Sequence, residues 1–163
     1  MNKYKFRKYN RKFVSLFEKE KTKLEKLLLK DSKIKHVGST AVPGLCGKGI
    51  IDILVIVPNK DLKASEKILL TKYKQMKTTS SVDRIAFKTD YWKLFGKRRV
   101  HIHLTYPNSK THKETINFRD NLRESEKLRK EYSDIKKDAV RIAKGEGAKY
   151  RALKEKFLKE NSR

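Results

Sequence analysis

The feature that most constrains the fold of this chain is an eight-residue apolar run at residues 50–57, which contains a single carboxylate. The run is short, rich in β-branched residues and bounded by Gly49 and Pro58. These properties predict a buried central strand. Asp52 is the third residue of the run, and a buried carboxylate is costly unless it is paired, hydrogen-bonded or bound to a metal. The Asp52 carboxylate is therefore expected either to bond to backbone amides or to a nearby Lys or Arg, or to belong to a functional site.

The other apolar residues fall in blocks of helical or alternating spacing, which predicts an α+β or α/β domain. We expect helices over about 9–30 and 61–73, strands over 34–37, 84–88, 91–95 and 100–106, and further helices within about 110–163. A loop is expected over 76–83, and turns at 89–90 and 96–99. Asn59 or Asp61 is expected to cap the second helix, and Ser109 or Thr111 the third. Because 163 residues suit one ordinary domain, we interpret 1–163 as a single domain with a helical C-terminal part.

The chain is strongly basic, with 43 Lys and Arg against 19 Asp and Glu, so its net charge is +24. Such an excess is expected either of a protein with a nucleic-acid partner or of a lysine-rich source proteome. Residues 1–12 and 91–113 carry basic side chains and no acidic one, so they are the better candidates for binding an anion. Tyr91, Trp92 and Phe95 are available there for stacking on bases, although core packing is the more ordinary role of such residues.

Several classes of protein are excluded. No apolar run approaches the ~18 residues that a membrane span needs. The basic start of the chain lacks the apolar segment of a secretory signal. A single cysteine, Cys46, rules out an internal disulfide and a cysteine cluster for zinc. We therefore expect a reduced, cytoplasmic protein that makes no use of a membrane.

Gly38, Ser39 and Thr40 follow the first expected strand and precede a glycine-rich stretch at 43–49. A strand that ends in such a turn can present backbone N–H groups and a hydroxyl to a phosphate. Glycine suits this role because the backbone must approach the phosphate without a Cβ in the way. The alternative is an ordinary tight turn.

Two further pairs of residues could carry chemistry. His101 and His103 alternate along one expected strand, so their side chains share a face and could meet a metal or a phosphate. The alternative is that both are simply half-exposed. Arg119 and Arg123 stand four residues apart on an expected helix, so both could reach one anionic group. Their alternative is a solvated helix face.

Four spaced blocks resemble the GrpB-like family. Residues 36–45, HVGSTAVPGL, and 47–54, GKGIIDIL, resemble its long signature, with Gly49 where the family usually has proline. Residues 101–104 resemble its HLH strand, and 117–123, NFRDNLR, its FRDYLR helix. Its closing helices are resembled by Tyr132, the segment 135–137, Tyr150 and the segment 154–157. The resemblance covers nearly the whole chain, from about residue 9 to residue 157.

This resemblance implies a nucleotidyltransferase-like fold of the DNA polymerase beta superfamily, a mixed β-sheet flanked by helices with a C-terminal helical segment. In that superfamily a Gly-Ser turn binds triphosphate, and carboxylates on two strands hold two divalent metals for nucleotidyl transfer. Gly38, Ser39 and Thr40 match the phosphate-binding turn, and Asp52 matches the first carboxylate, which is catalytic in the superfamily. The pattern then departs, because Leu54 stands where the second carboxylate is expected.

The departure leaves one carboxylate and two histidines for a metal. Asp52, His101 and His103 are therefore the implied ligands of a divalent ion, with Mg, Mn and Zn as candidates. Lys48, Arg98 and Arg119 are the candidates to neutralise phosphate charge.

The sequence thus leaves three functions open. The first is metal-dependent transfer of a nucleotidyl group from a nucleoside triphosphate to an unknown acceptor. The second is a catalytically degenerate module that binds a nucleotide or another phosphate compound. The third is a basic RNA-binding protein, whose affinity should fall steeply with salt.

Overall fold

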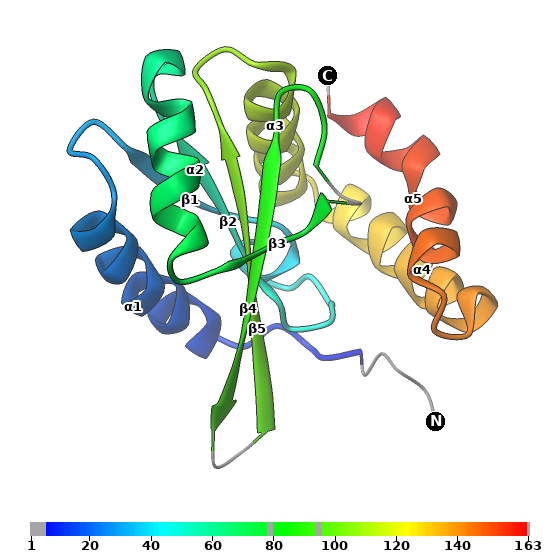
Figure 1. Cartoon of the computed structure of the whole chain (residues 1–163). Helices are drawn as coiled ribbons and strands as arrows, with labels where there is room; N and C mark the ends of the chain where they lie inside the picture. Colours follow the sequence, from blue (N-terminus) through cyan, green and yellow to red (C-terminus); the bar gives the residue numbers. More distant parts are fainter. Residues whose placement is uncertain (1–5, 78–79, 94–95, 163) are drawn as a thin grey trace.

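The computed structural model describes residues 6–77, 80–93 and 96–162, and the side chains of all these except 90–98. One five-stranded mixed sheet forms its centre, in the order β1-β2-β5-β4-β3 (Figure 1). Its strands are β1 (Lys33–Val37), β2 (Ile51–Ile56), β3 (Lys74–Gln75), β4 (Ile85–Lys93) and β5 (Gly96–Thr105). The two central strands, β2 and β5, are parallel, and the other neighbours are antiparallel.

Helices α1 (Lys12–Leu27) and α2 (Leu62–Leu70) cover one face of the sheet. Alternate residues of β2, namely Ile51, Ile53 and Val55, point to this face and are at most 3% exposed. They pack with Phe17 and Leu24 of α1 in the main core. The alternation of a strand and the apolar stripe of a helix together account for this layer.

The opposite face carries Asp52 and the three C-terminal helices, α3 (Lys110–Glu124), α4 (Glu126–Ala143) and α5 (Gly147–Asn161). Leu54 and Ile56 of β2 pack there with Ile116 of α3. A separate apolar cluster joins the three helices to the segment after β1, with Val42, Leu45, Phe118, Leu122, Tyr132 and Phe157 among its members. The C-terminal helices are thereby fixed to the residues that precede β2.

The expected α+β class, with its helical C-terminal part, is confirmed. The two turns expected around the basic segment are wrong. Strand β4 continues through Thr89 and Asp90, which pair with Val100 and Arg99, and the pairing reaches Lys93 and Gly96. Cross-strand pairing in a long hairpin here overrides the turn preference of Asp90.

Smaller differences occur at helix ends. Asp61 occupies the expected N-cap position of α2, but its side chain makes no capping hydrogen bond there, and Asn59 begins a 3₁₀ turn, Asn59–Asp61, before the helix. Ser109 does cap α3, since its hydroxyl accepts a hydrogen bond from the His112 amide at 3.0 Å. The short edge strand β3 was not expected, because two paired residues carry too little pattern to be seen. No helix in the described ranges is long and apolar enough to cross a membrane.

Candidate phosphate-binding site

The two expected histidines lie beside Asp52 in the sheet. In the parallel β2–β5 pair, Asp52 is opposite His101 and Leu54 is opposite His103. Asp52 Oδ1 lies 3.4 Å from His101 Nδ1 and 3.8 Å from His103 Nε2. The Asp52 side chain keeps 24% of its surface exposed, so this carboxylate is accessible from outside the core.

The electrostatics of this group favour an ionised Asp52. Burial alone would raise the pKa of Asp52, but hydrogen bonds and charge from His101 and His103 outweigh it and hold the pKa well below its usual range. Among the described residues, His103 Nδ1 is a buried nitrogen with no hydrogen-bond partner. A carboxylate that stays charged within the sheet is unusual in a purely structural strand.

The Gly38 turn is pressed directly against Asp52. Gly38 has a positive φ of 72°, and a Cβ at this position would lie 2.5 Å from Asp52 Oδ2. The next residues form the 3₁₀ turn η1 (Ser39–Ala41). A Cβ on Gly47 would collide with the Ser39 hydroxyl. The backbone before Lys48 therefore lies against the same turn, and glycine is required at both contacts.

Thr40 has a structural task in this turn. Its side chain is buried, donates to the Ile50 carbonyl at 3.0 Å and pairs with His36 Nε2 at 3.0 Å. The His36 ring stacks on Phe17 at 4.5 Å between centroids. Burial lowers the pKa of His36 to about 4, so this ring is neutral at physiological pH. The phosphate contact that we predicted for Thr40 stays a prediction, but its hydroxyl is already occupied.

Two lysines gather beside Asp52 on the helical side. Lys48 Nζ lies 3.5 Å from the centre of the Tyr150 ring, and Lys154 Nζ lies 4.5 Å from the same centre. Burial, together with the charges of Lys154 and Arg99, lowers the pKa of Lys48 to about 8, although Asp52 acts in the opposite direction. Burial also lowers the pKa of Lys154 to about 8, again opposed by Asp52. The positive charges of Lys48, Lys154 and Arg99 are thus gathered near the Asp52 carboxylate.

A third lysine extends this cluster into the core. Lys136 is 2% exposed, and its ammonium donates to the Cys46 carbonyl and lies 4.6 Å from the centre of the Tyr132 ring. Burial lowers the pKa of Lys136 to about 7, and the charge of Lys154 acts in the same direction. Neither Lys136 nor Lys154 was among the predicted site residues. Their only signal was the resemblance of the closing helices to the family pattern.

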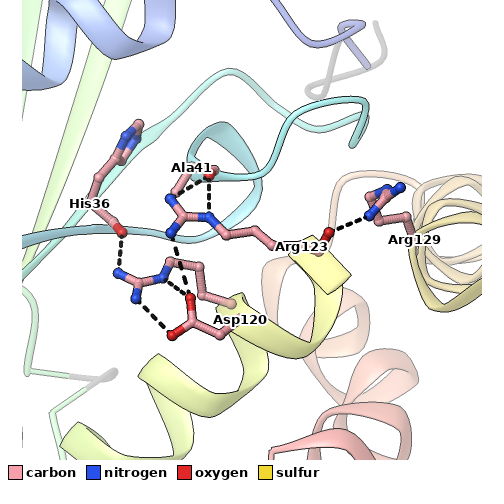
Figure 2. A network of polar contacts seen from close by, with 6 residues as sticks. His36, Ala41, Asp120, Arg123 and Arg129 are labelled. Carbon is pink, nitrogen blue, oxygen red and sulfur yellow. Dashed lines mark hydrogen bonds and ion pairs between the residues drawn. The ribbon is translucent and has the colours of Figure 1, made fainter. Parts of the chain in front are cut away.

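Arg119 and Arg123 hold the two ends of the Gly38 turn (Figure 2). Arg119 donates to the His36 carbonyl at 3.1 Å, and Arg123 donates twice to the Ala41 carbonyl at 3.1 and 2.9 Å. Both also contact Asp120, with Arg119 bonding it in a two-pronged pair at 2.8 and 2.9 Å. The two arginines do share one anionic group, as their spacing predicted, and it is a carboxylate of this chain. The solvated-face alternative is wrong for Arg119, which is 13% exposed.

The phosphate contacts predicted for two arginines, Arg98 and Arg119, stay predictions. The side chain of Arg98 lies outside the described residues, so its predicted phosphate contact stays a prediction. The predicted contact of Arg119 with phosphate also stays a prediction, although its guanidinium is engaged with Asp120 and the His36 carbonyl.

The predicted metal ligands come together, but they do not make a metal centre by themselves. In the part of the chain that the structure describes, no group of three or more His, Cys, Asp or Glu residues is arranged to hold a metal ion. Leu54 stands where the superfamily pattern has its second carboxylate, and it is fully buried. The donor set therefore does not fit two-metal chemistry, and the predicted divalent ion stays a prediction.

The fold is shared with nucleotidyltransferase-like proteins. The GLD-2/RNP-8 complex matches with a TM-score of 0.58 at 15% identity, over 90% of this chain and 57% of that chain. The Cid1 poly(U) polymerase matches with a TM-score of 0.52 at 13% identity, over 78% of this chain and 41% of that chain. At such identities the likeness concerns the fold alone.

The chain belongs to the GrpB family, whose model, described as GrpB protein, matches residues 3–163. The crystal structure of the conserved protein GrpB from Enterococcus faecalis matches with a TM-score of 0.81 at 26% identity, over 97% of this chain and 94% of that chain. The glutamate-rich protein GrpB of Alkalihalophilus pseudofirmus is 31% identical over 150 residues, which are 89% of this chain and 86% of that protein.

Some relatives are much longer than the match. The UPF0157 protein YqkA of Bacillus subtilis is 30% identical over 132 residues, which are 79% of this chain but 37% of that protein. The match to the UPF0157 protein BH1888 of Halalkalibacterium halodurans, at 46% identity over 50 residues, covers 26% of that protein. The chain thus spans less than half the length of these two relatives.

Proposed function

We propose that this chain binds a nucleoside triphosphate, or a related phosphate compound, at the site around Asp52, and that it acts as a binding module without two-metal nucleotidyl transfer. The observation that carries the proposal is the convergence of Lys48 and Lys154 on one ring beside the Gly38 turn. Burial disfavours both ammonium groups, the charge of Lys154 further disfavours that of Lys48, and the charge of Arg151 disfavours that of Lys154. A phosphate chain would relieve that repulsion and pair with both charges.

Each part of the site has a role in this proposal. The backbone after Gly38 and the Ser39 hydroxyl would donate hydrogen bonds to phosphate oxygens. Lys48 and Lys154 would neutralise the phosphate charge from the opposite side. The ionised Asp52 carboxylate would repel a phosphate group and so limit how closely it approaches.

We exclude two-metal nucleotidyl transfer from the proposal because of the side chains that are available to bind metal. Two-metal catalysis holds both ions by several carboxylates, whereas β2 supplies Asp52 alone and β5 supplies His101 and His103. Transfer of a nucleotidyl group to an unknown acceptor is the second candidate. It is favoured by the fold shared with a poly(U) polymerase and a poly(A) polymerase complex.

Calorimetric titration of nucleoside triphosphates tests the proposal, in EDTA and then with Mg²⁺, Mn²⁺ or Zn²⁺. In EDTA we expect the parent protein to bind the nucleotide measurably. Asp52→Asn should bind it equally or more tightly, because the variant lacks a negative charge that faces the phosphates. Binding that requires a metal and is lost in Asp52→Asn would place a metal at Asp52 and favour the transfer candidate. Absence of binding under every condition would contradict the proposal. Chromatography of the same mixtures would reveal pyrophosphate if transfer occurs.

RNA binding remains a third candidate because the net charge is +24. The side chains of 91–98, in one of the two acid-free segments, lie outside the described residues. An RNA affinity that falls steeply between low and physiological salt would support this function.

A further inference from the structure

A cavity of about 570 Å³ lies beside the Gly38 turn, with Ala41 and Pro43 among its lining residues. Helix α1, the segment that follows β1, and the α3–α4 junction line it. Its apolar wall is made by Val14, Phe17, Ala41 and Pro43. The volume falls in the range of small-molecule sites, and mostly apolar walls with a few polar groups are typical of such sites.

The cavity lies at the β1 edge of the sheet, between α1 on one face and the α3–α4 junction on the other, and its lining does not include Asp52. His36, which lines the cavity, pairs with Ile53 and faces α1. The next residue, Val37, pairs with Asp52 and faces the opposite side. Neither Lys48 nor Lys154 lines the cavity. A ligand bound here would therefore leave the Asp52 site accessible.

Two guanidinium groups line the cavity at the α3–α4 junction, and Figure 2 shows both. Arg129 uses Nη1 alone for its hydrogen bonds, to the carbonyls of Leu122 and Arg123 at 2.9 and 2.8 Å. Within the described residues, its Nε and Nη2 have no partner. Arg123 is 42% exposed, and its Nη1 has one long contact of 3.5 Å with Asp120. Planar N–H donors therefore remain available for an anion.

The other polar lining residues leave the cavity with positive charge. Glu18 is its only acidic lining residue, and Lys21 lies 3.9 Å from this carboxylate. His36 contributes no charge at physiological pH, because burial lowers its pKa to about 4. Tyr9 adds a ring and a hydroxyl. The Asp120 carboxylate that contacts Arg123 is shared with Arg119, so positive charge still exceeds negative charge around the cavity and favours an anionic ligand.

We propose that this cavity binds a small organic anion, with its carboxylate or phosphate ester on Arg129 and Arg123 and its apolar body against Val14, Phe17 and Pro43. The guanidinium fork matches both anionic groups, and the apolar wall rejects a bare inorganic ion. The proposal does not depend on nucleotide binding at Asp52.

Titrations followed by ¹H–¹⁵N NMR test this proposal with four probes of one shape: phenylacetate, phenyl phosphate, benzylamine and benzyl alcohol. We expect saturable shifts at 14–18, 36–43 and 123–129 with the anionic probes, and none with the cationic or the neutral one. Binding by both anions, or by one of them, supports the proposal and identifies the anionic group.

Variants locate the site. Arg129→Gln should lower the affinity for the anionic probes about tenfold, because a charged hydrogen bond is lost. Since Arg129 also holds the end of α3, Val14→Glu is the second variant. Val14 is 46% exposed, so the new carboxylate is tolerated by the fold but repels the anion. Val14→Gln introduces a side chain of the same size as Glu but without its charge, so this variant should bind the anion almost as the parent does. Arg141→Gln, on the exposed side of α4, should also bind it as the parent does.

Three results would overturn the proposal. The first is the absence of saturable shifts with both anions. The second is equal binding of benzyl alcohol, or equal binding by Val14→Glu and Val14→Gln. The third is a shift map centred on Lys48 and Lys154, with anion binding that Lys154→Met removes, because the anion would then occupy the Asp52 site.

Discussion

Gly38 touches Asp52 so closely that a Cβ on Gly38 would lie 2.5 Å from the Asp52 carboxylate oxygen Oδ2 and 2.9 Å from its Cβ. The turn after β1 and the carboxylate of β2 are therefore one unit, and neither can shift without the other. Glycine is required here for two separate reasons, which are the positive φ of 72° and the lack of space.

Gly38→Ala should lower the free energy of unfolding by about 2–5 kcal/mol, because backbone strain and overpacking add. Gly44→Ala is the matched control, since Gly44 also has a positive φ but nothing within 4 Å of its added Cβ. The control should lose only about 1–2 kcal/mol from the strained backbone. Urea unfolding measures both, and equal losses would show that Asp52 does not confine Gly38.

Arg119→Met should lower the free energy of unfolding by about 1–3 kcal/mol, because the His36 carbonyl and Asp120 both lose a donor. The control is Arg141→Met, whose ion pair with Asp138 joins two side chains that are 78% and 62% exposed. That change should stay within about 0.5 kcal/mol. If the two variants unfolded at the same urea concentration, the link between α3 and the Gly38 turn would carry no stability.

The buried Lys136 ammonium should make the free energy of unfolding increase as the pH rises. Its pKa is about 7 in the folded chain and 10.5 as the ordinary value, so the unfolded chain binds more protons between these limits. Stability should therefore increase with pH from about 7 upward, by at most about 1.4 kcal/mol per pH unit from this group. Lys48 and Lys154 add to the rise only above about pH 8.

Urea unfolding of Lys136→Met at pH 7 to 9.5 checks this, because the variant should lose most of the rise just above pH 7. Lys137→Met is the control on the same helix, since the Lys137 ammonium is exposed and pairs with Asp134 at 3.0 Å. It should keep the rise. An unchanged pH profile in Lys136→Met would mean that Lys136 is charged and solvated.

The sequence predicted the parts of the site that depend on strand alternation. Asp52 stands out because it interrupts an apolar run, and the spacing of His101 and His103 fixes them on one face. Their nearness to Asp52 required the parallel β2–β5 pairing, which no local pattern specifies. The family resemblance supplied the fold to which this pairing belongs.

The sequence missed what depends on how helices dock. Lys136 and Lys154 look like ordinary basic residues on amphipathic helices, and only the packing of α4 and α5 turns them inward. The sequence also did not show that the docking of α3 brings the Arg119 guanidinium to the His36 carbonyl. In the β4–β5 hairpin, residue preference at 89–90 predicted a turn where long-range pairing makes a strand.

The central claim is that Lys48 and Lys154 form a binding site for a phosphate chain, and the dependence of affinity on phosphate number tests it most directly. Calorimetry in EDTA should give an affinity that rises from nucleoside mono- to di- to triphosphate. Lys154→Met should remove most of that rise, and Lys159→Met, an exposed lysine on the same helix that pairs with Glu155, should keep it. Equal affinities for the three nucleotides, or an unchanged series in Lys154→Met, would contradict the account.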